Sequence, residues 1–288
     1  SRRRYTNSEG KHKWFTLEFT GNKHDPYSDI GLVSAEGGKD IINLTNSGYM
    51  SGYPHFALDG NAILFTTERY GMRAHASWGS LNDVMLVFMN QDAYDKFRLS
   101  KEDYELQKEL EKEQKNTTET KKNDKKKGDN KEKSEEKKEE KVKDIVVELN
   151  NIEDRIVRLT PNSSDLGSAI ITKDGETLYY LSAFEGGYDL WKMNLRKKDT
   201  KLLHKMDAGW ANMEMDKDGK NLFLLGSNTM QKMGTDSESL KPISYQAHVK
   251  MDLAAERDYM FNHVYKQEQK RFYNLIRNFE SMTILLFP

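Results

Sequence analysis

Three segments of the chain repeat one pattern of polar and hydrophobic positions. Each has an Asp-Gly pair, then two mostly polar residues, then a hydrophobic run; they are residues 58–65, 173–180 and 217–224. Glycine adopts positive φ without steric cost and aspartate hydrogen-bonds the nearby backbone, so each pair predicts a tight turn between two strands. Gly175 and Gly219 lie 44 residues apart. A period in the low forties with several short strands per unit indicates β-propeller blades of about four strands.

Other strand-like segments complete the repeat. Residues 14–19, 27–33 and 41–44 are alternating or continuous hydrophobic runs separated by glycine-containing turns, and we interpret them as the second half of a blade whose first half is missing. Residues 144–149 and 188–193 predict two further strands. The Asp-Gly hairpins then place each remaining strand in an antiparallel four-stranded blade.

The composition changes abruptly from Ser100 to Lys143, where Lys, Glu, Asn, Asp and Thr predominate. The start of this stretch predicts a helix, because Ser100 and Asp103 resemble a capping pair and Leu106 and Leu110 stand one turn apart. The remainder has nothing hydrophobic to bury, so we expect disorder around residues 115–140. The alternative interpretation of this stretch is a basic tail that binds nucleic acid, but the interleaved glutamates cancel its positive charge.

At Asp252 the hydrophobic period changes from two to about 3.6, which is typical of a helix with Asp252 as its N-cap. Its predicted hydrophobic stripe consists of Leu253, Met260, Phe261, Val264, Tyr265, Phe272, Leu275 and Ile276. The sequence thus predicts a mainly β chain, an incomplete propeller of four-stranded antiparallel blades. We expect blades in 1–99 (the first incomplete), the charged insertion in 100–143, blades in 144–251, and the start of a helical domain in 252–288.

Both ends suggest a fragment, since the chain opens on Ser1 without an initiator methionine and closes on a hydrophobic tail at Pro288. The chain has 288 residues and a formal net charge of −1, which argues against a dedicated nucleic-acid binder. It contains no cysteine, so disulfides, thiolate nucleophiles and cysteine-ligated metals are excluded. No hydrophobic run is long enough to span a bilayer.

The sequence contains no familiar catalytic motif. Gly-x-Ser-x-Gly, His-Glu-x-x-His, the P-loop and Gly-x-Gly-x-x-Gly are all missing, and the Ser-x-x-Lys match that starts at Ser134 lies in the charged stretch. We therefore predict no catalytic, cofactor-binding or metal-binding residue in this chain. Weaker candidates are His55, which would line a central channel or pack between blades, and His75, which lies in a loop that would contact a ligand or simply join two strands. In both cases we favour the structural reading.

Asp189 has the same ambiguity, and we expect its carboxylate to satisfy backbone amides of a turn. Aromatic side chains near Asp189 in the sequence would either form a platform on which a ligand stacks or pack in the core. We expect a core position for four of them: Tyr179, Tyr180, Trp191 and Trp210. Arg2, Arg3 and Arg4 would suit a carboxylate ligand, but they lie at the end of the chain.

The order of these features resembles the middle of tricorn-like serine peptidases, notably the long bacterial members. The residues that carry the resemblance are Ile152–Pro161 after the charged insertion, Gly187–Trp191 in the Asp-Gly blade, and 256–261 with 270–273 in the terminal helix. It extends from about Trp14 to Tyr273. The blade motif alone is shared with TolB-like propellers, whereas the Glu153-Asp154-Arg155 stretch combined with the helix is more specific. From Asn274 onward the sequence departs from the family.

The resemblance implies a propeller that gates peptides to a proteolytic chamber, with peptides or unfolded polypeptide as partners and a homo-oligomeric assembly. The family's catalytic histidine and serine lie beyond the matching region, so no catalytic residue is carried over. The resemblance implies a cytoplasmic location, and a periplasmic one stays open. The alternative function is a TolB-like protein-interaction module without enzymatic activity, which would not need the terminal helix.

Overall fold

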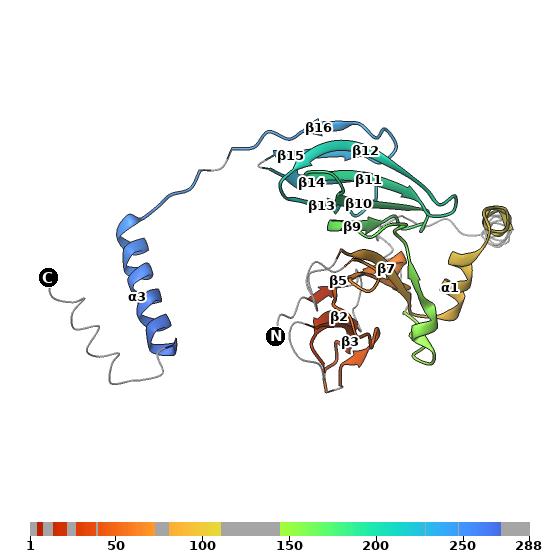
Figure 1. Cartoon of the computed structure of the whole chain (residues 1–288), viewed down its shortest axis with the longest axis horizontal. Coiled ribbons are helices and arrows are strands. Elements are labelled where there is room, and N and C mark those ends of the chain that lie inside the picture. The colour runs from red at the N-terminus through yellow and green to blue at the C-terminus, as the bar shows by residue number, and fades with distance from the viewer. Residues whose placement is uncertain are drawn as a thin grey trace, which may run out of the picture. The chain divides into compact units, whose positions relative to one another are not determined.

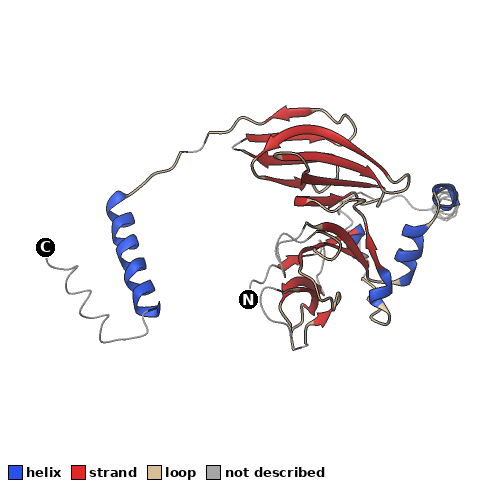
Figure 2. Ribbon diagram, in the orientation of Figure 1, coloured by secondary structure: helices blue, strands red, loops and turns tan. Residues whose placement is uncertain are grey.

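The computed structural model describes residues 5–7, 14–21, 27–38, 40–72, 81–110, 145–227, 229–246 and 248–271. The chain divides into two compact units, residues 1–243 and 244–288. Within the described residues of the first unit, strands form four antiparallel four-stranded sheets (Figure 1). Helices are few by comparison (Figure 2). These sheets are the blades of an incomplete β-propeller, as the sequence predicts.

Each blade contains four strands that follow one another along the chain. The first blade has β1 (Tyr5–Asn7), β2 (Trp14–Phe19), β3 (Asp29–Ser34) and β4 (Ile42–Asn43). The second has β5 (Ser51–Ala57), β6 (Ala62–Thr67), β7 (Asp83–Phe88) and β8 (Ile156–Arg158). The third has β9 (Asp165–Ile171), β10 (Thr177–Ala183), β11 (Tyr188–Asn194) and β12 (Asp199–Ala208). The fourth has β13 (Ala211–Met215), β14 (Asn221–Gly226), β15 (Thr229–Gly234) and β16 (Leu240–Pro242).

Two sequence-based expectations about these blades are wrong. The first blade has four strands, because β1 pairs with β2 from Tyr5↔Leu17 to Asn7↔Phe15. β1 has only three residues, and a segment so short and polar is not recognised as a strand from the sequence. Residues 145–149 form no strand, because the edge of β7 that they would have joined is taken by β8, with Leu86 opposite Val157.

All three Asp-Gly pairs lie in turns between the first and second strands of a blade. Their glycines have φ of +86° at Gly60, +72° at Gly175 and +72° at Gly219, which side chains with a Cβ adopt only with strain. The first turn is a short 3₁₀ helix, η1 (Leu58–Gly60). The predicted hairpins are thus confirmed, and the glycines are required by the backbone.

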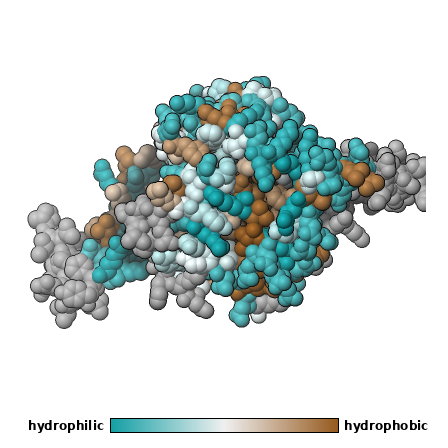
Figure 3. Space-filling model, turned by 45° about the vertical axis from the view of Figure 1, so that its right-hand side comes forward, coloured by the Kyte–Doolittle hydropathy of each residue, from teal (hydrophilic) through white to brown (hydrophobic). Residues whose placement is uncertain are grey.

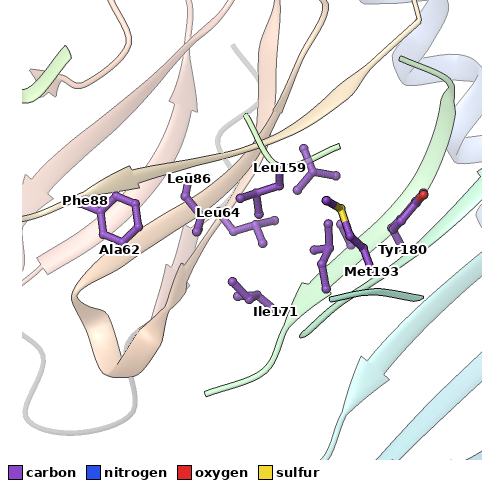
Figure 4. Packing of buried hydrophobic residues seen from close by; sticks show 11 residues of the cluster. Ala62, Leu64, Leu86, Phe88, Leu159, Ile171, Tyr180 and Met193 are labelled. Atoms are coloured by element: carbon purple, nitrogen blue, oxygen red, sulfur yellow. The ribbon is translucent and has the colours of Figure 1, made fainter. Parts of the chain in front are cut away.

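The core lies between the blades. β6 places Ala62 and Leu64 in the cluster between the second and third blades, whereas Ile63 and Phe65 belong to the cluster between the first and second. Figure 4 shows how the first of these clusters joins side chains from β6 and β7 to side chains from the third blade. A third cluster joins the third and fourth blades. Because successive strand residues point to opposite faces, β6 must be hydrophobic at each position from 62 to 65, where both faces are covered.

A repeated aspartate on the third strand ties each of the first three blades to the chain that leaves it. Asp29 accepts from Ser47 N at 2.9 Å, and Asp189 accepts from Met206 N and Asp207 N at 2.7 and 2.9 Å. Asp83 is fully buried and accepts from Ser163 Oγ at 2.7 Å and from Arg158 at 2.8 Å. We expected Asp189 to accept from backbone amides of a turn, and it accepts instead from two amides of β12, the last strand of its own blade. Asp29 and Asp83 bond residues in the connection to the next blade.

The insertion between β7 and β8 has a closed base. Arg155, in η2 (Ile152–Arg155), is 4% exposed and donates to the carbonyl oxygens of Phe88, Asn150 and Glu148. Phe88 precedes the insertion and the other two residues end it. The backbone N–H of Glu148 also donates to Met89 O at 2.8 Å. The two ends of the insertion are therefore held together independently of what lies between them.

The described start of the insertion packs on the third blade. It comprises α1 (Gln91–Arg98) and helical residues 101–110. Ser100 caps the second helix, as predicted, with its Oγ accepting from Asp103 N at 3.1 Å. Leu106 and Leu110 are nevertheless exposed, and Tyr104 is buried instead, with the Arg196 guanidinium 3.9 Å from its ring centroid. The spacing of Leu106 and Leu110 thus predicted the helix correctly. The helix contacts the third blade through Tyr104 and not through these two leucines.

The second unit contains α3 (Leu253–Arg271), and Asp252 caps it by accepting from Ala254 N and Ala255 N at 3.1 Å. The described members of its hydrophobic stripe are exposed or half-buried. The predicted disorder of residues 115–140 lies outside the described residues. On the face that Figure 3 shows, most side chains are hydrophilic, and hydrophobic side chains gather in a few patches.

Replacing Asp83 should destabilise the propeller. The substitution Asp83→Ala leaves the Arg158 guanidinium and two hydroxyl groups without their acceptor, which costs about 3 kcal/mol for a largely buried pair. The melting temperature should fall by roughly 10 °C, measured by circular dichroism. The control is Asp199→Ala at an exposed position. Equal melting temperatures for the two variants would contradict the role of Asp83.

Deleting residues 116–139 should cost little. Loop-closure entropy varies slowly with loop length, and the base is already closed by Arg155, so the change in unfolding free energy should be below about 1 kcal/mol. Thermal unfolding of the deletion variant measures it. A large fall in melting temperature would mean that the deleted segment packs on the blades.

Candidate functional site

The first strand of each blade lies at the inner edge of the array. β1 contacts β5, and β9 contacts β13, so neighbouring blades approach each other through these strands. Because the strands are antiparallel, the loop between the second and third strands lies at the same end as the connection to the next blade. In the third blade this end consists of residues 159–165, 184–187 and 207–210, which we call the acidic rim.

The acidic rim contains three exposed carboxylates, those of Asp165, Glu185 and Asp207, and no lysine or arginine. The opposite end of the same blade, residues 172–177 and 195–199, is mixed, with four basic and three acidic residues. One blade therefore has ends of different charge. An end of single sign attracts ligands of opposite charge before any contact is made.

A tyrosine–aspartate pair lies where the acidic rim meets the inner strand. Asp165 is the first residue of β9 and Tyr188 the first of β11, and the Tyr188 hydroxyl donates to Asp165 Oδ1 at 2.9 Å. Burial, then the hydrogen bond to Asp165 and its charge, and also the nearby Tyr53, raise the pKa of Tyr188 to about 12. The phenol is therefore protonated at neutral pH and serves as a donor that orients the carboxylate.

Tyr53 lies in the second blade and contributes electrostatically to the raised pKa of Tyr188. It lies in β5 at a bulge, where the pairing shifts between Gly52↔Thr66 and His55↔Leu64, so β5 has one extra residue. Its φ is +55° and its side chain is 58% exposed. Positive φ is costly for a bulky side chain, and bulges commonly redirect a side chain at a functional site. The strain thus holds a tyrosine outward beside the acidic rim.

Two further aromatic side chains are exposed on the acidic rim. Phe184 is 44% exposed and packs edge-on against Trp191 at 5.0 Å between ring centroids, and Trp210 is 47% exposed. The next residue after Trp210, Ala211, places its carbonyl oxygen 3.2 Å from where a Cβ would stand at Gly167. That glycine therefore allows β13 to approach β9 closely. Exposed aromatic groups gathered beside carboxylates are typical of binding surfaces.

A shallow cavity of about 300 Å³ lies elsewhere, between the insertion and the third blade. It is lined by Lys101, Tyr104, Glu105, Lys108, Glu176, Asn194, Arg196 and Lys197. Lys108 and Glu176 form an ion pair at 3.1 Å, and the Arg196 guanidinium donates to the carbonyl oxygens of Phe97 and Leu99. These groups fasten the insertion to the blade. Among the described residues, no group of three potential metal-ligating side chains occurs.

The comparisons with known proteins concern the fold. No protein-family model matches the sequence, and no curated protein matches it. Among solved structures, the tricorn protease is similar with a TM-score of 0.61 at 10% identity, over 96% of this chain and 25% of that chain. TolB from Acinetobacter baumannii has a TM-score of 0.47 at 13% identity, over 85% and 44% of the two chains. Prolyl oligopeptidase B from Galerina marginata has 0.48 at 7% identity, over 85% and 28%.

The chain has a tricorn-like propeller fold. It spans a quarter of the length of the tricorn protease that it matches. At 10% identity the likeness establishes the fold alone.

Within the tricorn-like propeller, the sequence candidates have mixed outcomes. His55 lies opposite Leu64, so it shares the face of β6 that packs toward the third blade, and burial lowers its pKa. This agrees with a packing role. Tyr179 and Tyr180 are buried and Trp191 packs against the core, as expected. Trp210 is exposed, so its expected core position is wrong. The candidates His75, Ser134 and Arg2–Arg4 lie outside the described residues.

Sequence reasoning did not single out Tyr53, Asp165 or Tyr188 as a site. The three residues are far apart in the sequence, and only the pairing of β9 with β10 and of β10 with β11 brings Asp165 and Tyr188 to the same end. The sequence did contain one signal. Tyr53 precedes Pro54, and proline inside a strand indicates an edge or a bulge.

Tyr188 should stay protonated well above the ordinary tyrosine range. Its folded pKa of about 12 exceeds the unfolded value near 10, so its stabilising contribution is present below about pH 10 and is lost as pH rises toward about 12. Between about pH 8 and about pH 11 the native protein and Tyr188→Phe should show the same increase in phenolate absorbance. In guanidinium chloride, which unfolds both proteins, the increase in phenolate absorbance should be larger in the protein with Tyr188, by the contribution of one tyrosine. A one-tyrosine difference in the native state would contradict the shift.

Proposed function

We propose that this chain is the non-catalytic propeller part of a tricorn-like serine peptidase and guides peptides or unfolded polypeptide toward a proteolytic domain outside the chain. The active assembly would be a homo-oligomer. The fold is shared with peptidase and non-peptidase propellers, so the choice between them depends on features other than the blades.

The observation that carries the proposal is how far the likeness to the tricorn protease extends. Residues 1–243, the propeller unit, make up 243 of the 288 residues, whereas the likeness covers 96% of the chain. It therefore includes most of the second unit, to which α3 belongs. A stand-alone propeller has no need of this helical unit.

The described side chains support a role in binding. The acidic rim offers exposed aromatic and carboxylate groups at one end of the third blade. In the described part of the chain, no serine hydroxyl is hydrogen-bonded to a histidine ring; His55 contacts Tyr53 O and His204 contacts Glu238 O. Nucleophilic catalysis needs such a pair within hydrogen-bonding reach. The proposal therefore assigns catalysis to residues outside this chain.

The second candidate function is a TolB-like module that binds a folded partner protein. It is favoured by the exposed hydrophobic side chains of α3, with Tyr259 70% and Val264 58% exposed, which suit a protein surface as well as a further domain of the same protein. We propose a cytoplasmic location and keep a periplasmic one as the alternative. None of the described helices is both long and hydrophobic enough to cross a bilayer.

Binding without cleavage is the test of the proposed function. The full chain should bind an unfolded polypeptide, for example a reduced and carboxymethylated protein carrying a neutral fluorophore, with a rise in fluorescence anisotropy. Gel electrophoresis after prolonged incubation should show the polypeptide intact. Cleavage that is lost when one serine of this chain is replaced would overturn the non-catalytic assignment. Absence of any binding would overturn the guiding role and leave the interaction module as the better reading.

A further inference from the structure

Glu238 of the fourth blade is held between two lysines of the third blade. It lies in the turn between β15 and β16, and its carboxylate accepts from Lys192 Nζ at 2.6 Å and from Lys201 Nζ at 2.8 Å. These hydrogen bonds, the one from Lys192 first, lower the pKa of the Glu238 carboxyl group. The His204 ring also contacts the Glu238 carbonyl oxygen at 2.7 Å. A carboxylate in a turn is therefore the polar anchor by which the fourth blade docks on the third.

The two lysines belong to a defined face of the third blade. Tyr179 pairs with Lys192, which pairs in turn with Lys201, so the three lie in one row across the sheet. The Lys192 Nζ lies 5.8 Å from the centroid of the Tyr179 ring. Two residues further along the strands, Leu181 lies opposite Leu190, and both are fully buried in the cluster shared with the fourth blade. The face thus combines an aromatic–lysine–lysine row with a hydrophobic pair.

The fourth blade repeats this arrangement, position by position, on the face turned away from the third blade. Phe223 pairs with Lys232, which pairs with Lys241, and the Lys232 Nζ lies 5.8 Å from the centroid of the Phe223 ring. The equivalent hydrophobic pair is Leu225 opposite Met230. No hydrophobic cluster of the described residues includes this face, and Leu225 is 37% exposed. The fourth blade therefore exposes the kind of face that, on the third blade, receives a carboxylate.

The lysine pair on this open face is not neutralised by the described part of the chain. Neither Lys232 nor Lys241 forms an ion pair with a described residue. Glu214 lies in the same row, but Phe223 stands between it and Lys232. Two neighbouring ammonium groups repel each other, and a carboxylate that accepts from both offsets this repulsion, as Glu238 does on the third blade. The open face is complementary in charge to a turn that carries an acidic residue.

We propose that the open face of the fourth blade docks a further propeller blade, outside this chain, whose turn between its third and fourth strands places a glutamate or aspartate between Lys232 and Lys241. Hydrophobic strand residues of that blade cover Leu225 and Met230, as the fourth blade covers the equivalent pair on the third. The inference rests on the proposed function, in which this chain is one part of a longer protein, and adds the chemistry by which the parts join.

The test uses a hairpin of known sequence as the probe. A synthetic peptide with residues 227–243, closed by a disulfide between added terminal cysteines and labelled with a neutral fluorophore, carries the glutamate that the third blade binds. The chain itself has no cysteine, so the disulfide is not exchanged. In anisotropy titrations with the full chain, this peptide should bind about fivefold more tightly than the same peptide with Glu238→Gln. The preference should decrease with salt.

A double variant of the chain locates the binding. Lys232→Gln with Lys241→Gln should abolish the preference for the glutamate peptide and leave the Kd of the glutamine peptide unchanged. The matched control is Lys217→Gln with Lys220→Gln, which removes two exposed lysines from the turn between β13 and β14 of the same blade. The control should keep the fivefold preference. Leu225→Ser should weaken both peptides by a similar factor, because it removes hydrophobic contact and no charge.

The outcomes separate the two proposals. Equal affinity of the two peptides, equal effects of the two double variants, or no binding of either peptide would overturn the carboxylate docking and leave the guiding function, which the unfolded polypeptide tests. Sedimentation of the full chain gives a second check. If the chain forms a dimer that Lys232→Gln with Lys241→Gln dissociates, the occupant is a second copy and a further blade is the wrong partner. Loss of the preference in that variant alone, with an unchanged melting temperature, supports the inference.

Discussion

The burial of the middle strands on both faces is the constraint on which the rest of the propeller depends. β6 and β10 each contribute to two hydrophobic clusters, one on either side of the sheet. A single blade would leave both of these faces in water, and each large hydrophobic side chain so exposed costs about 1.5–3 kcal/mol. The blades are therefore stable only as neighbours. The connections between them must accordingly be fixed, and Asp29 and Asp83 bond residues of these connections.

This constraint leaves the ends of the blades free to vary. A hydrophobic core between blades does not depend on the loops at their ends, so the same architecture accommodates the long insertion in the second blade and the acidic rim on the third. Arg155 shows how the insertion is isolated, because it holds the two ends together with its own donors. Binding surfaces on propellers arise at these ends, where charge and aromatic groups do not compete with packing.

The acidic rim lies at one end of the third blade, and Asp165 places one of its carboxylates at the inner strand, β9. The bulge at Tyr53 and the close approach at Gly167 are local departures from regular strand geometry, and both occur where β5 and β13 contribute to this region. The pairing of β9 with β10 and of β11 with β12 also shifts register near this region.

The sequence by itself determined the blades and their turns. The Asp-Gly pairs predicted the hairpins because Gly60, Gly175 and Gly219 need positive φ, and the hydrophobic runs after them predicted strands. The capping roles of Ser100 and Asp252 were also readable, since a cap depends on residues within one turn. The resemblance to tricorn-like peptidases agreed with the fold that the structure shows.

Only the tertiary structure decided which residues meet. β1 is too short to have a local signal and is recognised by its pairing with β2, whereas residues 145–149 have a strand-like sequence but no available partner edge. Trp210 is exposed although tryptophan usually packs in a core, because a connection between blades offers it no neighbour to bury against. The pair of Asp165 and Tyr188 depends on strand register across β9, β10 and β11, a long-range property that no local pattern of the sequence specifies.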